Sequence, residues 1–207
     1  MKRMASFSKL FSTTITAATL AFFCATIHAQ VNAKDPYGVE QGQTPVLQLG
    51  LQYDATHANA PPSGGCGCFW MQGGGMQLDF TIHRNWSAAA DLYGAGASQI
   101  NGTDERLSLF NYVFGPRYSL WNHTRYTPYA QALFGASEVF SNFNVYGKGE
   151  TSFAAQVGGG LQYHVNHFLS IVPVEANWVH SQALNGVNTR QNNIRVGAGI
   201  TFRVGPR

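Results

Sequence analysis

The sequence predicts an all-β fold, an eight-stranded antiparallel up-and-down transmembrane β-barrel, from three observations. Apolar residues alternate with polar or small ones in eight segments, as in strands with two different faces. The connections between these segments are alternately short and long, which is typical of membrane barrels with periplasmic turns and extracellular loops. The polar face is also rich in glycine, which suits the crowded interior of a narrow barrel.

The alternation is regular in the first three segments and in the last one. In the first, leucines oppose Gln48, Gly50, Gln52 and Asp54; in the last, Arg195 and Arg203 lie on the face opposite Ile194 and Phe202. The predicted strands cover residues 47–54, 76–82, 86–95, 107–120, 128–137, 153–165, 169–180 and 194–204. Pro116 and Pro173 fall inside two of them, and because proline lacks a ladder donor we expect a bulge or irregularity at each.

The connections divide into two classes by length. Brief turns, "HRN", "WNHTRYT" and "VNH", follow the second, fourth and sixth strands. Longer polar loops follow the first, third, fifth and seventh strands. They cover residues 57–65, 96–106, 138–151 and 181–191. We therefore expect four loops at one end of the barrel, the extracellular end.

The composition of the two faces indicates which one meets lipid. One face carries charged residues, glutamines and glycines, and the other carries leucine, isoleucine, phenylalanine and valine. A closed barrel satisfies every backbone group in hydrocarbon, so the apolar face is assigned to lipid and the polar face to the lumen. A secreted, soluble lipocalin-like binder, the alternative with the same strand pattern, would have an apolar interior instead.

Four tryptophans lie at strand ends, where aromatic girdles are expected. Trp86 and Trp121 fall at the end with the short turns, and Trp70 and Trp178 at the end with the long loops. The sequence therefore predicts one girdle at each membrane surface.

The N-terminus reads as a secretory signal peptide of residues 1–29, with Lys2, Arg3 and Lys9 before an apolar run and a cut after Ala29 or Ala33. A periplasmic extension, 30–44, and the barrel, 45–204, then follow. Loss of the leader leaves ten basic against ten acidic residues, so no nucleic-acid partner is inferred.

The chain resembles the small eight-stranded outer-membrane β-barrels, OmpA/OmpX-like in architecture. The resemblance rests on the leader and on the strand segments "GPRYSL" (115–120), "PYAQALFGAS" (128–137) and "NIRVGAGITFRV" (193–204). It implies a bacterial outer-membrane location and outer-membrane lipid as a partner. The chain departs from some relatives in two ways: no periplasmic domain is expected after the eighth strand, and Phe202, rather than a final aromatic residue, is expected to act as the assembly signal.

The charged residues of the predicted strands lie on the lumen face. Arginine can bind two carboxylates at once, so a salt-bridged plug is predicted in a barrel too narrow for water flow; a narrow ion path is the alternative. The predicted lumen polar network consists of Asp79, Asp91, Arg117, Glu175, Arg195 and Arg203, with Asp54 on the same face.

Other candidate chemistry is weaker. Cys66 and Cys68 in "SGGCGCFWMQGGG" predict a small disulfide or two thiols at the base of a loop; no metal site or cofactor is expected. A lipid A deacylase-like triad would need His180, Ser181 and Glu175, but adjacent strand residues face opposite ways.

The leading hypothesis is therefore a non-enzymatic outer-membrane barrel with an envelope-structural or surface-interaction role through its four loops. The loop partner is unknown, and we expect a monomer. A lipid-modifying enzyme and a soluble binder are the rival hypotheses.

Overall fold

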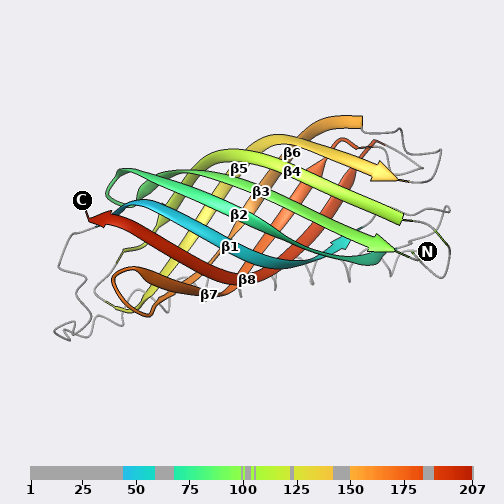
Figure 1. The fold of residues 1–207 in the computed structure, drawn as a ribbon. Helices are drawn as coiled ribbons and strands as arrows, with labels where there is room; N and C mark the ends of the chain where they lie inside the picture. The colour runs from blue at the N-terminus through green and yellow to red at the C-terminus, as the bar shows by residue number, and fades with distance from the viewer. Residues whose placement is uncertain are drawn as a thin grey trace, which may run out of the picture. The chain divides into compact units, whose positions relative to one another are not determined.

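A computed structural model describes residues 44–58, 68–98, 100, 104, 106–121, 124–141, 150–183 and 189–206. Eight antiparallel strands form one closed barrel in which each strand pairs with its sequence neighbours and β8 pairs with β1 (Figure 1). The predicted fold class is confirmed. The strands are β1 (Pro45–Ala58), β2 (Phe69–His83), β3 (Trp86–Ser98), β4 (Arg106–Ser119), β5 (Tyr126–Ser141), β6 (Glu150–His164), β7 (Leu169–Ser181) and β8 (Gln191–Pro206).

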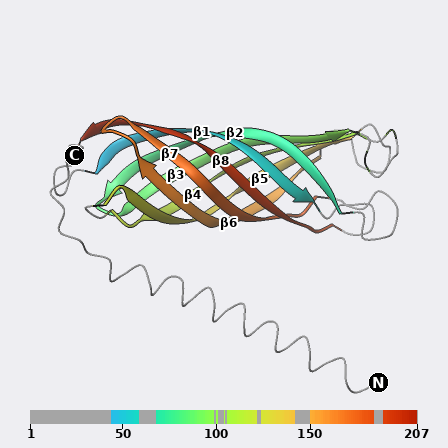
Figure 2. The same ribbon diagram turned by 90° about the horizontal axis from the view of Figure 1, so that it is seen from below.

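The strands run obliquely around the barrel, as two views 90° apart show (Figures 1 and 2). The turns after β2, β4 and β6 lie at one end, with the start of β1 and the end of β8. The four longer connections leave from the other end. The predicted leader, its cleavage site and the extension up to residue 43 lie outside the described residues, so the division at 29 stays a prediction.

Most strands extend further toward the long-loop end than the alternation predicts. The pairing of β1 with β2 continues from Leu51↔Met76 to Ala58↔Phe69, through three consecutive glycines. Glycine has no side chain to mark a face, so the pattern disappears from the sequence while the backbone ladder continues. The approach to β2, residues 69–75, is therefore strand, as are His57 and Ala58 of the predicted first loop; residues 59–65 lie outside the described residues.

The two prolines inside strands behave differently. The register shifts by one residue between Val172 and Glu175, so the bulge predicted at Pro173 is confirmed. At Pro116 there is no bulge, because Ala88↔Pro116 stays in register and the β4–β5 pairing keeps one register on both sides. The β4–β5 ladder is interrupted at Gly115 and Pro116, which is the local irregularity given as the alternative. A missing donor interrupts a hydrogen bond, but it does not require an extra residue in the strand.

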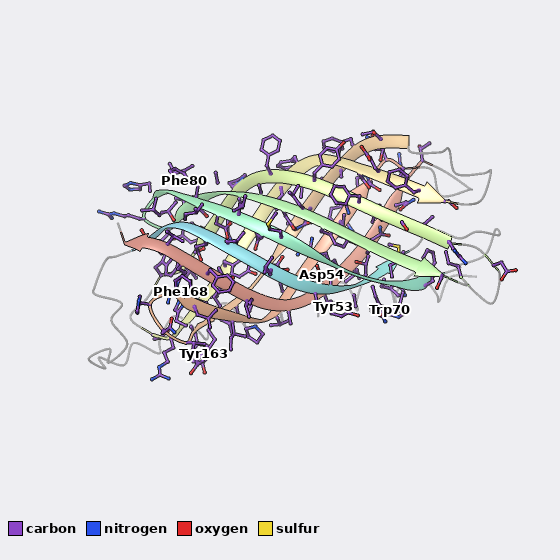
Figure 3. All side chains as sticks on the ribbon, in the orientation of Figure 1. Tyr53, Asp54, Trp70, Phe80, Tyr163 and Phe168 are labelled. Carbon is purple, nitrogen blue, oxygen red and sulfur yellow. The ribbon has the colours of Figure 1, made fainter. Side chains whose placement is uncertain are left out.

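The two faces of the barrel have the predicted polarity through the middle of the strands. Phe114, Ile82 and Phe80 are among the outward side chains, and Phe114 is 70 % exposed. Arg117 and Arg195, each 1 % exposed, point inward. Figure 3 shows Trp70 and Phe80 projecting from the outer wall near opposite ends of β2. This polarity is that of a membrane barrel and the reverse of a soluble binder with an apolar pocket.

Two neighbouring glycines of the β2–β3 ladder give a test of interior crowding. A Cβ on Gly73 would overlap the Gly94 carbonyl oxygen and lie 2.6 Å from the Ala95 Cα, whereas a Cβ on Gly96 would meet its nearest atom, the Ser108 Oγ, at 3.5 Å. We expect Gly73→Ala to lower the free energy of unfolding by about 1–3 kcal/mol, the usual cost of overpacking, and Gly96→Ala to leave it nearly unchanged. Urea titration of the refolded barrel in lipid vesicles measures both, and equal effects would contradict the packing described.

Candidate functional site

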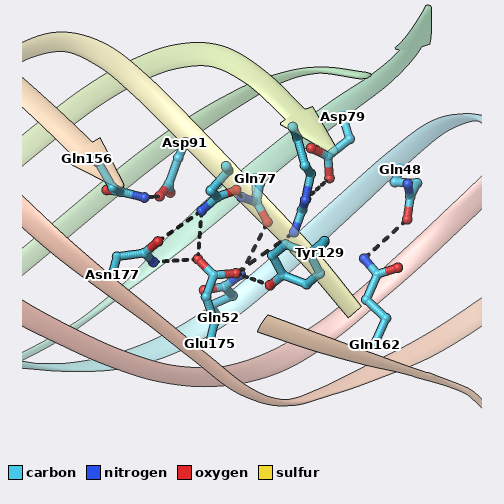
Figure 4. A network of polar contacts seen from close by, with 12 residues as sticks. Gln48, Gln52, Gln77, Asp79, Asp91, Tyr129, Gln156, Gln162, Glu175 and Asn177 are labelled. Atoms are coloured by element: carbon cyan, nitrogen blue, oxygen red, sulfur yellow. Dashed lines mark hydrogen bonds and ion pairs between the residues drawn. The ribbon is translucent and has the colours of Figure 1, made fainter. Parts of the chain in front are cut away.

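Glu175 of β7 is the centre of a polar network that crosses the barrel interior (Figure 4). Its Oε2 accepts hydrogen bonds from Tyr129 and, at 2.9 Å, from the Gln52 Nε2. Its Oε1 accepts from the Gln131 Nε2 at 3.1 Å and from the Asn177 Nδ2 at 2.7 Å. The strands that supply these groups, β1, β5 and β7, lie around the barrel, so one carboxylate joins distant parts of the wall.

Arg195 of β8 binds carboxylates from two further strands. Its Nε lies 3.0 Å from the Asp54 Oδ1 and its Nη1 lies 2.6 Å from the Asp91 Oδ2. Its Nη2 lies 3.8 Å from the Glu175 Oε1, and its guanidinium carbon lies 4.4 Å from the centre of the Tyr93 ring. The planar fork of arginine allows this multiple engagement, which a lysine ammonium would not reproduce.

Arg117 of β4 forms the second arginine site. It is paired with Asp79 of β2, and its Nη2 lies 4.0 Å from the Glu175 Oε2. Its guanidinium carbon lies 3.6 Å from the centre of the Tyr129 ring, so the charge is also held by a cation–π contact. Glu175 therefore links the two arginine sites into one network.

The structure brings together five of the six predicted lumen residues: Asp79, Asp91, Arg117, Glu175 and Arg195. The sixth, Arg203, is 6 % exposed and donates to the Asn166 carbonyl oxygen near the β6–β7 turn, away from these ion pairs. The predicted network did not include Tyr129 or the glutamines, although the glutamines were predicted on the lumen face. Their inward face was readable from strand parity, but their partners on distant strands were not.

The glutamines extend the network between opposite walls. The Gln156 Nε2 of β6 donates to the Asp91 Oδ2 of β3 at 2.8 Å, and the Gln77 Nε2 of β2 donates to the Gln131 Oε1 of β5 at 2.9 Å (Figure 4). Nearer the short turns, the Gln162 Nε2 donates to the Gln48 Oε1 at 3.3 Å. Neutral amide side chains thus fill the space around the ion pairs and donate hydrogen bonds to some of the carboxylate oxygens.

The outer end of the interior is apolar, which the sequence reasoning missed. A cluster of buried side chains lies there, supplied by the ends of β1 to β5 that lead to the long loops and by neighbouring segments. Its members are Ala58, Phe69, Met71, Tyr93, Ala95, Ile100, Leu107, Leu109, Val139 and Ala183. The expectation of a polar lumen is therefore wrong for this end; the signal was present, because Leu107 and Leu109 share strand parity with Arg117.

A methionine pair on β2 tests the contribution of this apolar cluster. Met71 is buried inside the barrel at 1 % exposure, and Met76 faces lipid at 38 % exposure. We expect Met71→Ala to lower the free energy of unfolding by about 2–5 kcal/mol, because it leaves a cavity, and Met76→Ala to have a smaller effect because lipid can fill the space. Urea unfolding in vesicles, followed by gel mobility without heating, measures both; an equal or larger loss for Met76→Ala would contradict the placement.

The end with the short turns is closed by a small polar group. The His164 Nε2 lies 2.7 Å from the Thr127 Oγ1 and its Nδ1 lies 2.8 Å from the Ser170 Oγ. The Trp121 ring stacks on the His164 ring, with centroids 5.5 Å apart. Both ring nitrogens are thus engaged within the fold.

The predicted girdle tryptophans lie toward the ends of the wall. Trp86, Trp70 and Trp178 are about half exposed, whereas Trp121 is half-buried against His164. Trp86 packs edge-on against Tyr118, with centroids 4.9 Å apart, and Trp70 packs on His57 at 5.0 Å. Three of the four therefore face outward in the positions that a girdle requires.

The residues of the rival enzyme hypothesis are not assembled. Ser181 is 1 % exposed and faces inward, whereas the neighbouring His180 is half-buried on the outer face, with its Nδ1 2.8 Å from the Asn192 Oδ1. Glu175 is occupied by the central network. The serine hydroxyl and the imidazole therefore do not form the nucleophile–base pair that such a triad needs.

Among the described residues, neither a cysteine pair nor a metal-binding cluster forms a further site. Cys68 is half-buried just before β2, and Cys66 lies outside the described residues, so the predicted disulfide stays a prediction. Within the described residues, no group of three or more histidine, cysteine or acidic side chains is arranged to hold a metal ion. The part of the chain that the structure describes also contains no helix long and apolar enough to cross a membrane.

The closed barrel, its apolar outer wall and its charged interior define a β-barrel protein of the bacterial outer membrane. The chain belongs to the outer membrane protein beta-barrel domain family, whose model matches residues 15–206. The predicted resemblance and location are thereby confirmed.

Two solved structures share the fold. Neisserial surface protein A is 18 % identical, with a TM-score of 0.57 over 75 % of this chain and 96 % of that one. Ail, the attachment invasion locus protein of Yersinia pestis, is 14 % identical, with a TM-score of 0.52 over 77 % of this chain and 100 % of that one. A comparison with curated proteins finds no match. At these identities the likeness concerns the fold alone.

Proposed function

We propose that this protein is a non-enzymatic outer-membrane barrel with a closed lumen, which serves the envelope or contacts other surfaces through its four extracellular loops. The observation that carries the proposal is the buried network of Glu175, Arg195 and Arg117. It joins strands on opposite sides of the barrel, which supports a lumen that is blocked at this level. The apolar cluster around Met71 closes the outer end above it.

The narrowness of the barrel supports the same conclusion. An eight-stranded barrel has an interior that side chains can fill, whereas the water-filled porins have sixteen or more strands. A charge buried without a partner would be very costly, so these side chains are held in place by their mutual pairing. This favours the plug over the narrow ion path.

The surface-contact role is supported by the topology. The long connections leave from the same end of the barrel, opposite the short turns, and are presented outward by a rigid scaffold. The names of the two similar structures describe a surface protein and an attachment invasion locus protein. Those descriptions belong to those proteins, and a contact role for this chain is our proposal.

Replacement of residues 140–149, which hold the third long connection, by a two-residue Asn-Gly turn tests the role. Strands β5 and β6 already pair up to Val139↔Glu150, so the barrel can close on a tight turn. We expect heat-modifiable migration to be kept while adhesion of expressing bacteria to host cells or matrix falls, or their resistance to detergents is lost. An unchanged adhesion and resistance after all four loops are shortened would contradict the proposal.

The enzyme alternative is tested in the same cells. Lipid A analysis should show the same acylation with wild-type protein and with Ser181→Ala. Altered acylation that depends on Ser181 would overturn the non-enzymatic assignment.

A further inference from the structure

The outer wall has an apolar groove near the end with the short turns. Its floor is the outward face of β3, where Ala88 lies between Phe80 and Pro116 in the ladder, and Ala90 lies between Leu78 and Phe114. The hollow has a volume of about 610 Å³, in the range of small-molecule sites, and its lining is almost entirely apolar. Phe80 can be seen to project from the wall at this end (Figure 3).

A basic hairpin turn lies directly beyond the groove. Ile82 and Trp86 line the groove, and the turn between them carries His83 and Arg84, both exposed. The turn is fixed to the neighbouring strand, because the Ser119 backbone N–H donates to the Asn85 carbonyl oxygen at 2.8 Å. Arg84 therefore lies on an anchored turn, within two residues of the apolar lining.

The charge of this end of the barrel is of one sign. His83, Arg84, Arg125 and His167 are exposed or half-buried there. Aspartate and glutamate are absent from the described residues of this end, 81–87, 118–121, 124–127, 163–170 and 202–206. Because short turns are periplasmic, the basic end faces the headgroups of the inner leaflet of the outer membrane.

We propose that the groove and the Arg84 turn together form a binding site for an anionic phospholipid of the inner leaflet. An acyl chain lies along Ala88 and Ala90 between the walls formed by Phe80 and Phe114, and the lipid phosphate pairs with Arg84. The groove buries the apolar acyl chain and the adjacent basic turn attracts the anionic headgroup, so a single lipid molecule can occupy both.

A second copy of the chain is the other candidate occupant of the groove. Two barrels that share one membrane orientation would meet through a two-fold axis along the membrane normal, so each would present the same patch. The two Arg84 turns would then lie close together, with no acidic residue among the described residues of that end. Charge repulsion therefore favours lipid over a dimer at this site.

Native mass spectrometry of the purified barrel tests the site, with phosphatidylglycerol and phosphatidylcholine of identical chains as probes. We expect preferential retention of phosphatidylglycerol. Ala88→Leu, which fills the groove, should weaken its binding, and Arg84→Gln should weaken it about fivefold, the effect of roughly 1 kcal/mol per basic residue at a lipid surface. Heat-modifiable migration shows that each variant is folded.

Two matched variants complete the test. Ala198→Leu adds the same side chain at an exposed alanine of β8, and Arg125→Gln removes an arginine from another turn at the same end. Both should bind phosphatidylglycerol like the wild type. Equal retention of the two lipids, equal losses in the control variants, or a dimer that Ala88→Leu abolishes would each overturn the proposal.

Discussion

Replacement of Arg195 by methionine should destabilise the barrel more than any other single change in the interior. The substitution leaves Asp54 and Asp91 buried without their arginine, and it removes one of two guanidinium groups that serve four carboxylates. Breaking a buried ion pair from one side costs about 3–5 kcal/mol, because the remaining charge is uncompensated. We expect a loss in this range for Arg195→Met.

The measurement is equilibrium urea unfolding in phosphatidylcholine vesicles, with folding followed by gel mobility and tryptophan fluorescence. The control is Ile194→Met, the adjacent residue of β8, which faces lipid at 54 % exposure. It should change the free energy of unfolding by less than about 1.5 kcal/mol, as volume-conserving apolar exchanges do. Similar losses in the two variants would show that Arg195 is not the centre of a buried charge network.

The pair of Arg117 and Asp79 should show the strongest coupling in the barrel. Both side chains are 1 % exposed, and the hydrogen bond of Asp79 within the network is to Arg117. Arg117→Met and Asp79→Asn should each be strongly destabilising, because the first leaves Asp79 buried without its ion pair and the second leaves Arg117 with only its longer contact to Glu175. The double variant should be more stable than the sum of the single losses predicts, by about 1–3 kcal/mol.

A second double-mutant cycle supplies the control for this coupling. Asp54 is paired with Arg195, so Arg117→Met combined with Asp54→Asn should give losses closer to additive. If the two cycles gave the same coupling energy, the network would not be divided into the two arginine sites that the structure describes.

The sequence was sufficient to predict the strand number, the polarity of the wall and the parity of the charged residues. These follow from local periodicity, since an inward position recurs every second residue and the turns fix the count. The ion-pair partners were not predictable. Asp91 and Arg195 are 104 positions apart, and their contact depends on how the strands are staggered when the barrel closes.

Two features escaped prediction for separate reasons. The three glycines at 73–75 hide the alternation of β2, so residues 66–75 were predicted only as the entry to that strand, and Met71 was not assigned to its inward face. The apolar outer end then went unrecognised, because the inward face was treated as uniformly polar. Extending the alternation of inward and outward positions beyond the regular segments would have revealed the apolar outer end of the interior.

Single-channel recording in planar bilayers tests most directly whether the lumen of the barrel is closed. A sixteen-stranded porin in the same bilayers serves as the positive control. The wild-type barrel should give no stable open-channel steps at any voltage that the bilayer tolerates. Long-lived ohmic openings of the wild-type protein, abolished by heat unfolding before insertion, would contradict the account.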